Sequence, residues 1–301
     1  MKEESKVVTS NFKHTPVLAK ELLEAISKLP NVLLEKGMMV DATIGAGEHA
    51  ALVLKSFPSF NIIGLDQDPN AIETASKRLL SFESRVKLIS SNFADFIPQE
   101  KVACVFADLG VSSPQIDHAN RGFSFRFNGP IDMRMNPSKG MTAKELIEQL
   151  DEKSLADLIY KYGEEKFSRR IARKIKNDLL MKGPYEGTTE LAYAIGGCYP
   201  NKLRYGRIHP ATKTFQALRI AINNEIEALE KLLKTAPNWL LPGGIFGVIS
   251  FHSLEDRLVK HSFTKDDRLR RLTKKPIIAS ENEKNINPRS RSAKFRIAIK
   301  K

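Results

Sequence analysis

Short apolar runs alternate with amphipathic stretches through the first third of the chain. Four apolar runs have the length of a strand, at residues 38–40, 62–65, 86–89 and 102–107. Helical periodicity lies around them, at residues 21–29, at 48–56 and after Asp68, which with Pro69 predicts a helix start capped by Asp68. Strands that alternate with helices favour right-handed crossovers, so this pattern predicts a doubly wound, mostly parallel α/β sheet.

The pattern changes after Asp108. Residues 140–181 show helical periodicity and no strand-like run, which predicts an inserted helical subdomain. Further on, residues 214–233 predict one long amphipathic helix that ends before Pro237, followed by a turn at 241–244 and a buried strand at 245–251. We therefore expect a core made of residues 1–118 and 211–301, interrupted by a substrate-recognition subdomain at 119–210.

A glycine turn follows the first predicted strand. Gly45 and Gly47 suit a loop whose backbone approaches a ligand closely, and Asp66, at the end of the second strand, comes 19 positions after Gly47. This spacing suits an acid that binds ribose hydroxyls. The same glycines with Ala50 also fit a degenerate dinucleotide fingerprint, so a nicotinamide-dependent oxidoreductase is an alternative. A third alternative is a tight turn without any ligand.

The segment from Asp108 to Gln115 leaves the end of the fourth predicted strand, where doubly wound sheets bind their ligands. Methyltransferases that act on the exocyclic amine of a nucleobase use an acidic or amide residue followed by a Pro-containing turn at this place. Such an amine is a poor nucleophile because its lone pair is delocalised into the ring. It needs acceptors for its hydrogens before it attacks a methyl group. The carbonyl groups of Ser112 and Ser113, in a turn with Pro114, can supply these acceptors beside Asp108.

The positive charge of the chain is concentrated at its C-terminal end. The 301 residues carry a net charge of +13, and residues 257–301 hold 15 Lys and Arg against 4 Asp and Glu. A basic tail beside a mildly acidic core suggests that a polyanion is held against a site. The side chains expected to contact phosphates are Arg268, Arg270, Arg271, Lys274 and Lys275. The alternative is a solvated tail without a partner.

Several classes of protein are not expected. The apolar stretches are shorter than a membrane span, and Met1–Glu4 do not begin a signal peptide, so we expect a cytoplasmic protein with no membrane partner. Cys104 and Cys198 form no disulfide framework, and neither they nor the six histidines have the spacing of metal ligands. We therefore predict no metal.

At these motifs and at others along its length, the chain resembles the RsmH (MraW) family of bacterial 16S rRNA cytosine-N4 methyltransferases. The resemblance is carried by His14–Leu18, Asp41–His49, Asp66–Pro69, Asp108–Gln115, Arg121–Phe125, Gly129–Met135, Tyr162–Glu165, His209–Ala217, Ser250–Arg257 and Asn287–Ser292. It implies a Rossmann-like class I methyltransferase core with a helical insertion, and S-adenosylmethionine as the cofactor. It also implies 16S rRNA or the small ribosomal subunit as the partner.

The resemblance also implies a cofactor pocket, to which the glycine-loop argument adds Gly45. Its residues are Gly47, Glu48, His49, Asp66, Phe93, Asp108 and Gln115. Phe93 is expected to pack on the adenine. Glu48 departs from the family pattern, which usually has a second glycine there; its carboxylate either meets the methionine ammonium or crowds the loop. Asp66 is expected to accept hydrogen bonds from both ribose hydroxyls.

The expected reaction is direct displacement, in which the N4 amine of an extruded cytidine attacks the cofactor's methyl carbon. The residues expected at the reacting centre are Asp108, Ser112, Ser113, Pro114 and His252, and neither cysteine is needed. His252 follows a strand end and contacts either the target base or the insertion. A non-catalytic RNA-binding protein is a further alternative, and the sequence leaves monomer and homodimer open.

Two phenylalanines allow two interpretations. Phe123 and Phe125, beside Arg121 and Arg126, either form a stacking surface for splayed RNA or fold their loop onto the core.

Overall fold

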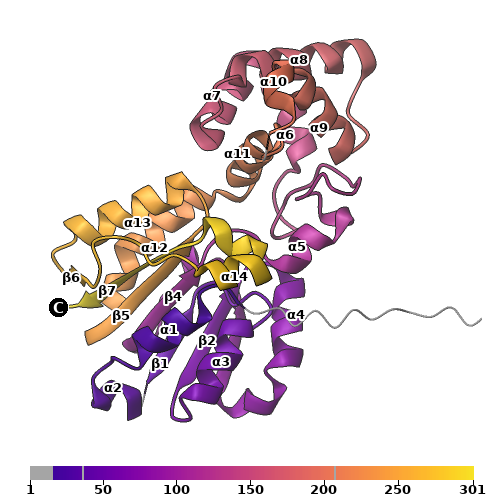
Figure 1. Cartoon of the computed structure of the whole chain (residues 1–301). Helices are drawn as coiled ribbons and strands as arrows, with labels where there is room; N and C mark the ends of the chain where they lie inside the picture. Colours follow the sequence, from indigo (N-terminus) through magenta and orange to yellow (C-terminus); the bar gives the residue numbers. More distant parts are fainter. Residues whose placement is uncertain (1–15, 36, 207) are drawn as a thin grey trace, which may run out of the picture.

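The computed structural model describes residues 16–301 except 36 and 207. His14, Thr15 and Met1–Glu4, which the sequence analysis considered, lie outside the described residues. Within them, seven strands form one sheet in the order β3-β2-β1-β4-β5-β7-β6 (Figure 1). The strands are β1 (Met38–Asp41), β2 (Asn61–Asp66), β3 (Val86–Ser90), β4 (Val102–Asp108), β5 (Leu240–Ser250), β6 (Leu269–Arg271) and β7 (Lys294–Lys300).

The sheet is mostly parallel, as the alternation of strands and helices predicts. Strands β1 to β5 pair in parallel, whereas β7 runs antiparallel to both β5 and β6. The parallel strands end together, so Asp41, Asp66 and Asp108, each the last residue of its strand, lie at the same edge of the sheet. This edge is where doubly wound folds bind ligands.

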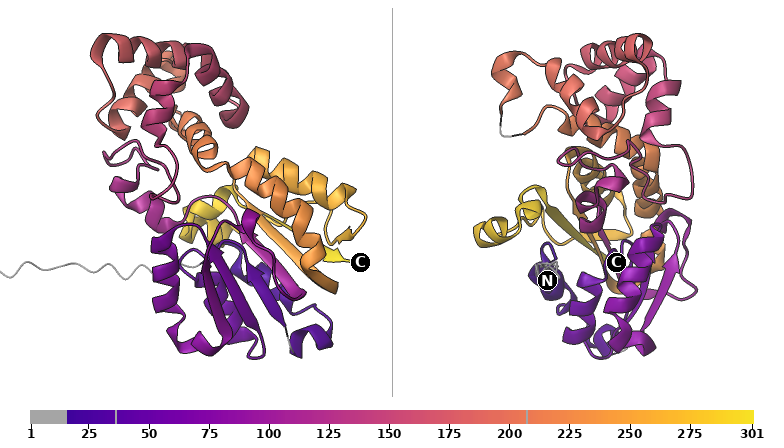
Figure 2. Two further views of the ribbon diagram at one scale, coloured as in Figure 1. Left: turned by 180° about the vertical axis from the view of Figure 1, so that it is seen from behind. Right: turned by 90° about the vertical axis from the view of Figure 1, so that its right-hand side faces the viewer.

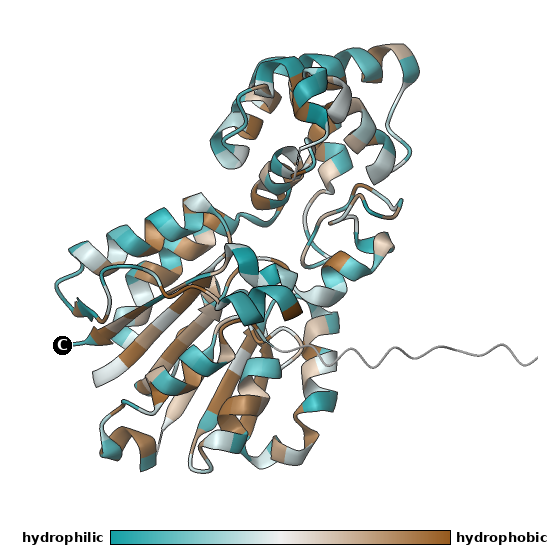
Figure 3. Ribbon diagram, in the orientation of Figure 1, coloured by the Kyte–Doolittle hydropathy of each residue, from teal (hydrophilic) through white to brown (hydrophobic). Residues whose placement is uncertain are grey.

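Helices cover both faces of the sheet. Because successive side chains of a strand point to opposite faces, a central strand such as β4 contributes to two apolar clusters. Cys104 and Phe106 of β4 belong to one apolar cluster with α1 (Ala19–Ile26) and α3 (Glu48–Ser56). Val105 and Ala107 belong to the other, with α12 (Glu225–Trp239) and α13 (Ser253–Lys265). The apolar strands lie between these layers, and hydrophilic residues gather on the helices (Figure 3). Two further core helices are α2 (Asn31–Glu35) and α4 (Pro69–Arg78).

A group of helices stands apart from the sheet and surrounds a third apolar cluster (Figures 1 and 2). The helical pattern at 140–181 is confirmed, because this stretch forms helices without a strand. The cluster extends through Ala211, Phe215 and Leu218, so α11 shares its core with the group. The helices are α6 (Ala143–Gln149), α7 (Glu152–Gly163), α8 (Ser168–Lys182), α9 (Thr188–Gly197), α10 (Asn201–Arg204) and α11 (Thr212–Asn223).

The prediction of one long helix over 214–233 is wrong. The chain forms α11 and α12 instead, with Asn224 between them in the left-handed conformation at φ 49°. Asn tolerates this conformation better than most residues, so the apolar periodicity continues through a sharp break. Pro237 lies inside the last turn of α12 and not beyond it.

The prediction of a turn at 241–244 is also wrong. These residues belong to β5, where the pairing with β4 shifts register between Val102 and Cys104. Gly243, at φ 80°, takes a conformation that favours glycine, so the irregularity is absorbed inside the strand. No helix in the described part of the chain is both long and apolar enough to cross a membrane.

Candidate active site

The glycine loop after β1 is held against the end of β2. Gly45 and Gly47 have φ values of 52° and 77°, in the region that glycine adopts without strain. The Gly45 amide donates to Asp66 Oδ2 over 3.1 Å, and the Asp68 amide donates to Asp66 Oδ1 over 2.9 Å. Asp66 therefore organises the two loops that flank it. Burial raises the pKa of its carboxyl group to about 6, against hydrogen bonds that lower it.

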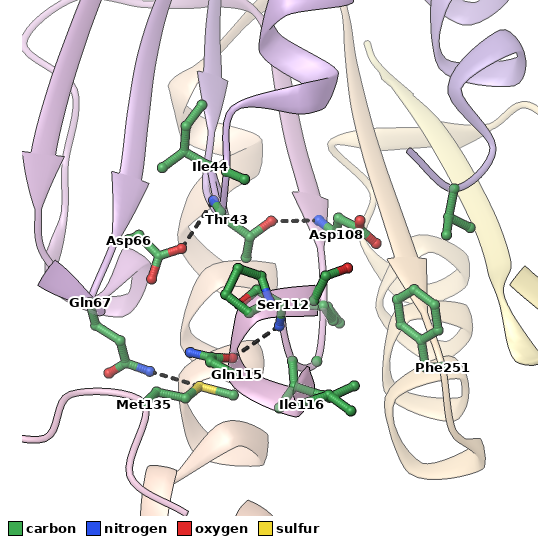
Figure 4. A pocket seen from close by; sticks show the side chains of 18 of the residues that line it. Thr43, Ile44, Asp66, Gln67, Asp108, Ser112, Gln115, Ile116, Met135 and Phe251 are labelled. Carbon is green, nitrogen blue, oxygen red and sulfur yellow. Dashed lines mark hydrogen bonds between the residues drawn. The ribbon is translucent and has the colours of Figure 1, made fainter. Parts of the chain in front are cut away.

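A cavity of about 720 Å³ opens at the carboxyl ends of β1, β2, β4 and β5. Its volume lies in the range of small-molecule sites. Asp66 and Asp108 border it with Thr43 between them, and Ser112 and Gln115 follow from β4 (Figure 4). Ten of the site residues predicted from the sequence line it: Gly45, Glu48, His49, Asp66, Phe93, Asp108, Ser112, Ser113, Pro114 and Gln115.

Two predicted residues are not in the wall. Gly47 precedes α3 as its N-cap, and a Cβ at this position would lie 3.1 Å from Leu79 Cδ1, so the residue shapes the loop from behind. His252 is the N-cap of α13, where its Nδ1 accepts from the Glu255 amide over 3.4 Å. Its neighbours Phe251 and Glu255 line the cavity in its place.

Glu48, the departure from the family pattern, has a partner within the protein. Its Oε1 lies 3.3 Å from Nη2 of Arg78, which comes from α4 and also lines the cavity. The carboxylate is therefore drawn toward the α4 side of the loop, and it remains part of the wall.

Asp108 and His49 face each other inside the site. The Nε2 atom of His49 lies 2.9 Å from the carbonyl oxygen of Val17, so it carries the proton and leaves Nδ1 unprotonated. This Nδ1 lies 3.8 Å from Asp108 Oδ2, and burial lowers the pKa of His49 to about 4, so its ring is neutral. Asp108 Oδ1 is buried and has no hydrogen-bond partner among the described residues.

The surroundings of Asp108 favour a positively charged ligand. Burial, and then the charges of Asp41, Glu255 and Glu48, raise the pKa of Asp108 well above its usual range. A cation placed in the cavity would lower the cost of ionising these acids. A cofactor with a sulfonium and an ammonium group fits such a site, and Asp66 suits its ribose hydroxyls.

Asp68 is a structural residue, as the sequence predicts, and it also connects the site to the insertion. Its Oδ1 accepts from the Asn70 amide, which caps α4. Its buried Oδ2 accepts from Gln115 Nε2 over 2.9 Å and from Arg121 Nη1 over 2.7 Å. The Gln115 Oε1 atom accepts in turn from the Ser112 amide over 2.9 Å. This network fixes the start of α5 (Ser113–Asp117) to the loop after β2.

An ion pair that lines the cavity was not predicted from the sequence. Arg219 of α11 forms a bidentate pair with Glu225 of α12, at 2.8 and 2.9 Å, across the Asn224 break. Burial alone would raise the pKa of nearby Glu255, but His252 and Arg219 hold it below its usual range. The motif that includes Phe215 predicts a helix here, but only the kink brings Arg219 and Glu225 to the wall.

Glu225, His252 and Glu255 offer ligand atoms within 4.8 Å of one another, a grouping that sequence spacing did not indicate. Each of these side chains has a charged or backbone partner in the protein, but His252 Nε2, 3.1 Å from Glu255 Oε1, is buried without a hydrogen bond among the described residues. Glu225 is paired with Arg219, and His252 Nδ1 accepts the cap hydrogen bond, so its Nε2 carries the proton in the neutral ring. A metal ligand needs a free lone pair at that nitrogen. The arrangement therefore fits a polar network better than a metal site.

The two phenylalanines after the site pack inside the protein. The ring of Phe125 contacts those of His209 and Phe215, with centroids 4.6 and 4.9 Å apart. Phe123 packs against the same cluster and lies 5.8 Å from the Arg121 guanidinium. These contacts favour the interpretation in which the loop folds inward, although it packs on the helical insertion and not on the core. The exposed aromatic side chain of the loop is Phe127, beside Arg126.

The strand order with a reversed β7, the glycine loop after β1 and the acid at the end of β2 define a Rossmann-like class I methyltransferase core. The chain belongs to the MraW methylase family, whose model matches residues 11–301. It is therefore a methyltransferase, and its cofactor is S-adenosylmethionine.

Relatives match over the whole chain. The ribosomal RNA small subunit methyltransferase H of a Prochlorococcus marinus strain (SARG / CCMP1375) is 72% identical over 301 residues, covering 100% of this chain and 99% of the relative. The protein of the same name from Synechococcus sp. (strain WH7803) is 57% identical and covers 100% and 99%. A solved putative rRNA-methylase from Clostridium thermocellum is 14% identical with a TM-score of 0.44, covering 96% and 99%.

Proposed function

We propose that this protein transfers a methyl group to the exocyclic N4 of a cytidine in the decoding region of 16S rRNA, by direct displacement. The observation that carries the proposal is the position of Asp108 and the Ser112–Ser113–Pro114 turn on the cavity wall that also holds Asp66. Relatives named ribosomal RNA small subunit methyltransferase H support the choice of RNA. A nicotinamide-dependent oxidoreductase explains neither this turn nor the basic tail, and a non-catalytic RNA-binding protein leaves Asp66 and Asp108 without a role.

The proposed mechanism assigns positioning to the chain's own residues. When bound, S-adenosylmethionine supplies a methyl group activated by a positively charged sulfur. Asp66 and the glycine loop would hold its adenosine end, and Phe93 would pack on its adenine. Asp108 and the carbonyl groups of Ser112 and Ser113 accept hydrogen bonds from the target amine and align its lone pair, and the proton that the methylated nitrogen loses passes to solvent. The Ser112 carbonyl oxygen already accepts from the Ile116 amide, so it offers its second lone pair. His252 contacts Glu255, which lines the cavity, so its role is to position this part of the wall.

The domain division is part of the same proposal. The core of residues 1–118 and 211–301 binds the cofactor, and residues 119–210 recognise the rRNA or the small subunit. The third apolar cluster supports a separately packed insertion, which also takes in Ala211, Phe215 and Leu218 beyond residue 210. We further propose that the protein acts in the cytoplasm, where its substrate is assembled.

The test is nucleoside mass spectrometry of 16S rRNA incubated with the protein and S-adenosylmethionine, as naked RNA and as assembled subunits. We expect N4-methylcytidine from one of these substrates. Cells that lack the gene should lack the same nucleoside. Methylation only at another atom, such as C5 of cytosine, would contradict the proposed chemistry while leaving the family assignment intact.

Replacement of both cysteines by alanine should leave methyl transfer largely intact. Cys104 is fully buried in β4, and burial raises the pKa of its thiol, as it does for Cys198. Neither residue lines the cavity. A nucleophilic cysteine needs an accessible thiolate, which neither can offer. Steady-state methylation by the double variant tests this. Loss of activity in a folded double variant, or a covalent adduct with RNA, would contradict the displacement mechanism.

Four side chains of the basic tail, of which three are exposed and Arg271 is half-buried, should contact rRNA phosphates. Arg268, included in the sequence prediction, is held by Asp266, Asn238 and the Lys234 carbonyl, so we leave it unchanged. Replacement of the four remaining side chains by glutamine should lower RNA affinity. The log–log salt slope should fall by about 0.7 per lost phosphate contact. The replaced residues are Arg270, Arg271, Lys274 and Lys275.

The matched control removes four charges around the strand starts, at the other edge of the sheet. Its residues are the exposed Lys28, Lys55, Lys87 and Lys101. RNA affinity measured across a salt series should change its slope in the tail variant and not in the control. Equal slopes in wild type and both variants would mean that the tail is only a solvated surface.

A further inference from the structure

The segment between β6 and β7 does not stay near the sheet edge where it starts. It forms α14 (Glu281–Ile286) and η4 (Pro288–Ser292) and lies beside the carboxyl ends of the strands before it enters β7 (Figure 1). Asn287, Arg289 and Ser292 line the cavity. We call residues 281–292 the C-terminal hook. The Asn287–Ser292 motif is part of the family resemblance, but the proposed function gives it no role.

Arg289 connects the hook to the turn after Asp108. Its Nη1 donates to Ser113 Oγ, and its Nη2 donates to Asp117 Oδ1 over 2.9 Å. Ser113 and Asp117 are the first and last residues of α5, so one guanidinium spans the whole of this short helix. The planar, multidentate form of the guanidinium makes such a bridge possible, whereas a lysine ammonium is a single point charge.

The hook itself is held in place from both sides. Glu283 Oε1 accepts from the Leu18 amide over 2.8 Å, next to Val17, whose carbonyl oxygen contacts His49. At the other end, Ser290 is fully buried and its hydroxyl donates to the Asn287 carbonyl over 2.8 Å. Arg289 is therefore presented to α5 from a fixed support, which a positioning role requires.

We propose that Arg289 is a positioning residue for methyl transfer, which aligns the Ser112–Ser113–Pro114 turn with the target amine. This inference rests on the proposed function, because the turn is the proposed acceptor site. The α5 helix has five residues and follows Gly110, at φ 94°, so its own hydrogen bonds hold it weakly. Gln115 ties one side of the helix to Asp68, and Arg289 ties the other.

The contact with Arg289 also orients the Ser113 side chain. Because the guanidinium has only donors, Ser113 Oγ accepts from it, and the hydroxyl hydrogen of Ser113 must point elsewhere. Ser113 lines the cavity, so this hydrogen is available to an acceptor on the target base. Cytosine carries an acceptor nitrogen beside its amine, whereas uracil carries an N–H there. The same contact therefore lets the Ser113 hydroxyl donate to this ring nitrogen of cytosine.

The test is the kinetics of Arg289→Ala with the methyl-acceptor RNA. Loss of charge-assisted hydrogen bonds to a positioning group should lower kcat by about 10- to 100-fold. The Kd for S-adenosylmethionine and the salt slope of RNA affinity should not change. Arg289→Lys should give an intermediate kcat, because an ammonium cannot bridge Ser113 and Asp117 together. The control is Arg291→Ala, an exposed side chain of the same hook whose hydrogen bond within the described part of the chain goes to the Lys284 carbonyl.

A double-mutant cycle distinguishes positioning from simple loss of stability. Ser113→Ala combined with Arg289→Ala should cost little more kcat than either change alone, since both remove the same contact. If Arg289→Ala does not fold, Asp117→Asn removes only the second anchor and should lower kcat by a smaller factor. An unchanged kcat in folded Arg289→Ala overturns the proposal. So does an effect confined to RNA affinity with a reduced salt slope, which would make Arg289 a phosphate contact.

These outcomes are separate from failure of the proposed function. If the wild-type protein does not methylate cytidine N4, the proposed function fails before any variant is compared. If the wild type does so and Arg289→Ala is equally fast, only the role of Arg289 fails.

Discussion

Replacement of Asp66 by alanine should weaken the binding of S-adenosylmethionine by about 2–4 kcal/mol, or roughly 30- to 1,000-fold in Kd. The loss has two sources. The variant lacks the acceptor that we propose for the ribose hydroxyls, and it also loses the contacts of Asp66 with the Gly45 and Asp68 amides. The glycine loop and the start of α4 should both become less ordered without these contacts. Isothermal titration calorimetry with the purified protein measures the effect.

Asp66→Asn is the informative partner variant. Asparagine keeps one carbonyl acceptor but places an NH₂ group at the other oxygen, which cannot accept from a backbone amide. We therefore expect an intermediate Kd. Asp95→Ala serves as the control, because this exposed carboxylate pairs with Lys231 at the surface, outside the cavity wall. An unchanged Kd in folded Asp66→Ala would remove this residue from the cofactor site.

The core of the site could be predicted because its determinants are local. Gly45 and Asp66 each follow a short apolar strand, and parallel strands end at one edge of a sheet. Correct prediction of two strand ends is therefore enough to predict that the loops after them lie side by side. The same reasoning placed Asp108 and the Ser112–Ser113–Pro114 turn, since β4 pairs with β1.

The rest of the cavity wall depends on where distant segments of the chain change direction. The pattern of apolar residues along the sequence does not predict these changes. Arg219 and Glu225 meet only because the chain reverses at Asn224, within a periodicity that predicts one helix. Arg289 reaches Ser113 only because the hook returns to the strand ends, 176 positions further along the chain. A basic tail interpreted through its charge alone suggests RNA binding, whereas part of it builds the site.

Asp41→Asn should stabilise the protein in a strongly pH-dependent way. Asp41 ends β1 behind the cavity wall, is 1% exposed and accepts a hydrogen bond from the Thr43 amide. Burial, together with the charge of Asp66, raises its pKa to about 7, from an ordinary value of 3.8. Because the folded state holds this proton more tightly than the unfolded chain, the carboxyl group stabilises the fold below pH 4. That contribution is lost as the pH rises through about 7.

Asparagine keeps the carbonyl acceptor for Thr43 and carries no charge at any pH. The free energy of unfolding of Asp41→Asn, relative to wild type, should therefore rise from pH 5 to pH 8. The full shift of about three pKa units corresponds to about 4 kcal/mol, of which the two units between pH 5 and pH 7 give a gain of about 3 kcal/mol in this window. Urea unfolding of both proteins without cofactor, at pH 5, 6, 7 and 8, measures this difference. The exposed Asp95→Asn should run parallel to wild type. A constant offset between Asp41→Asn and wild type would show that Asp41 is already ionised in the folded protein at pH 5.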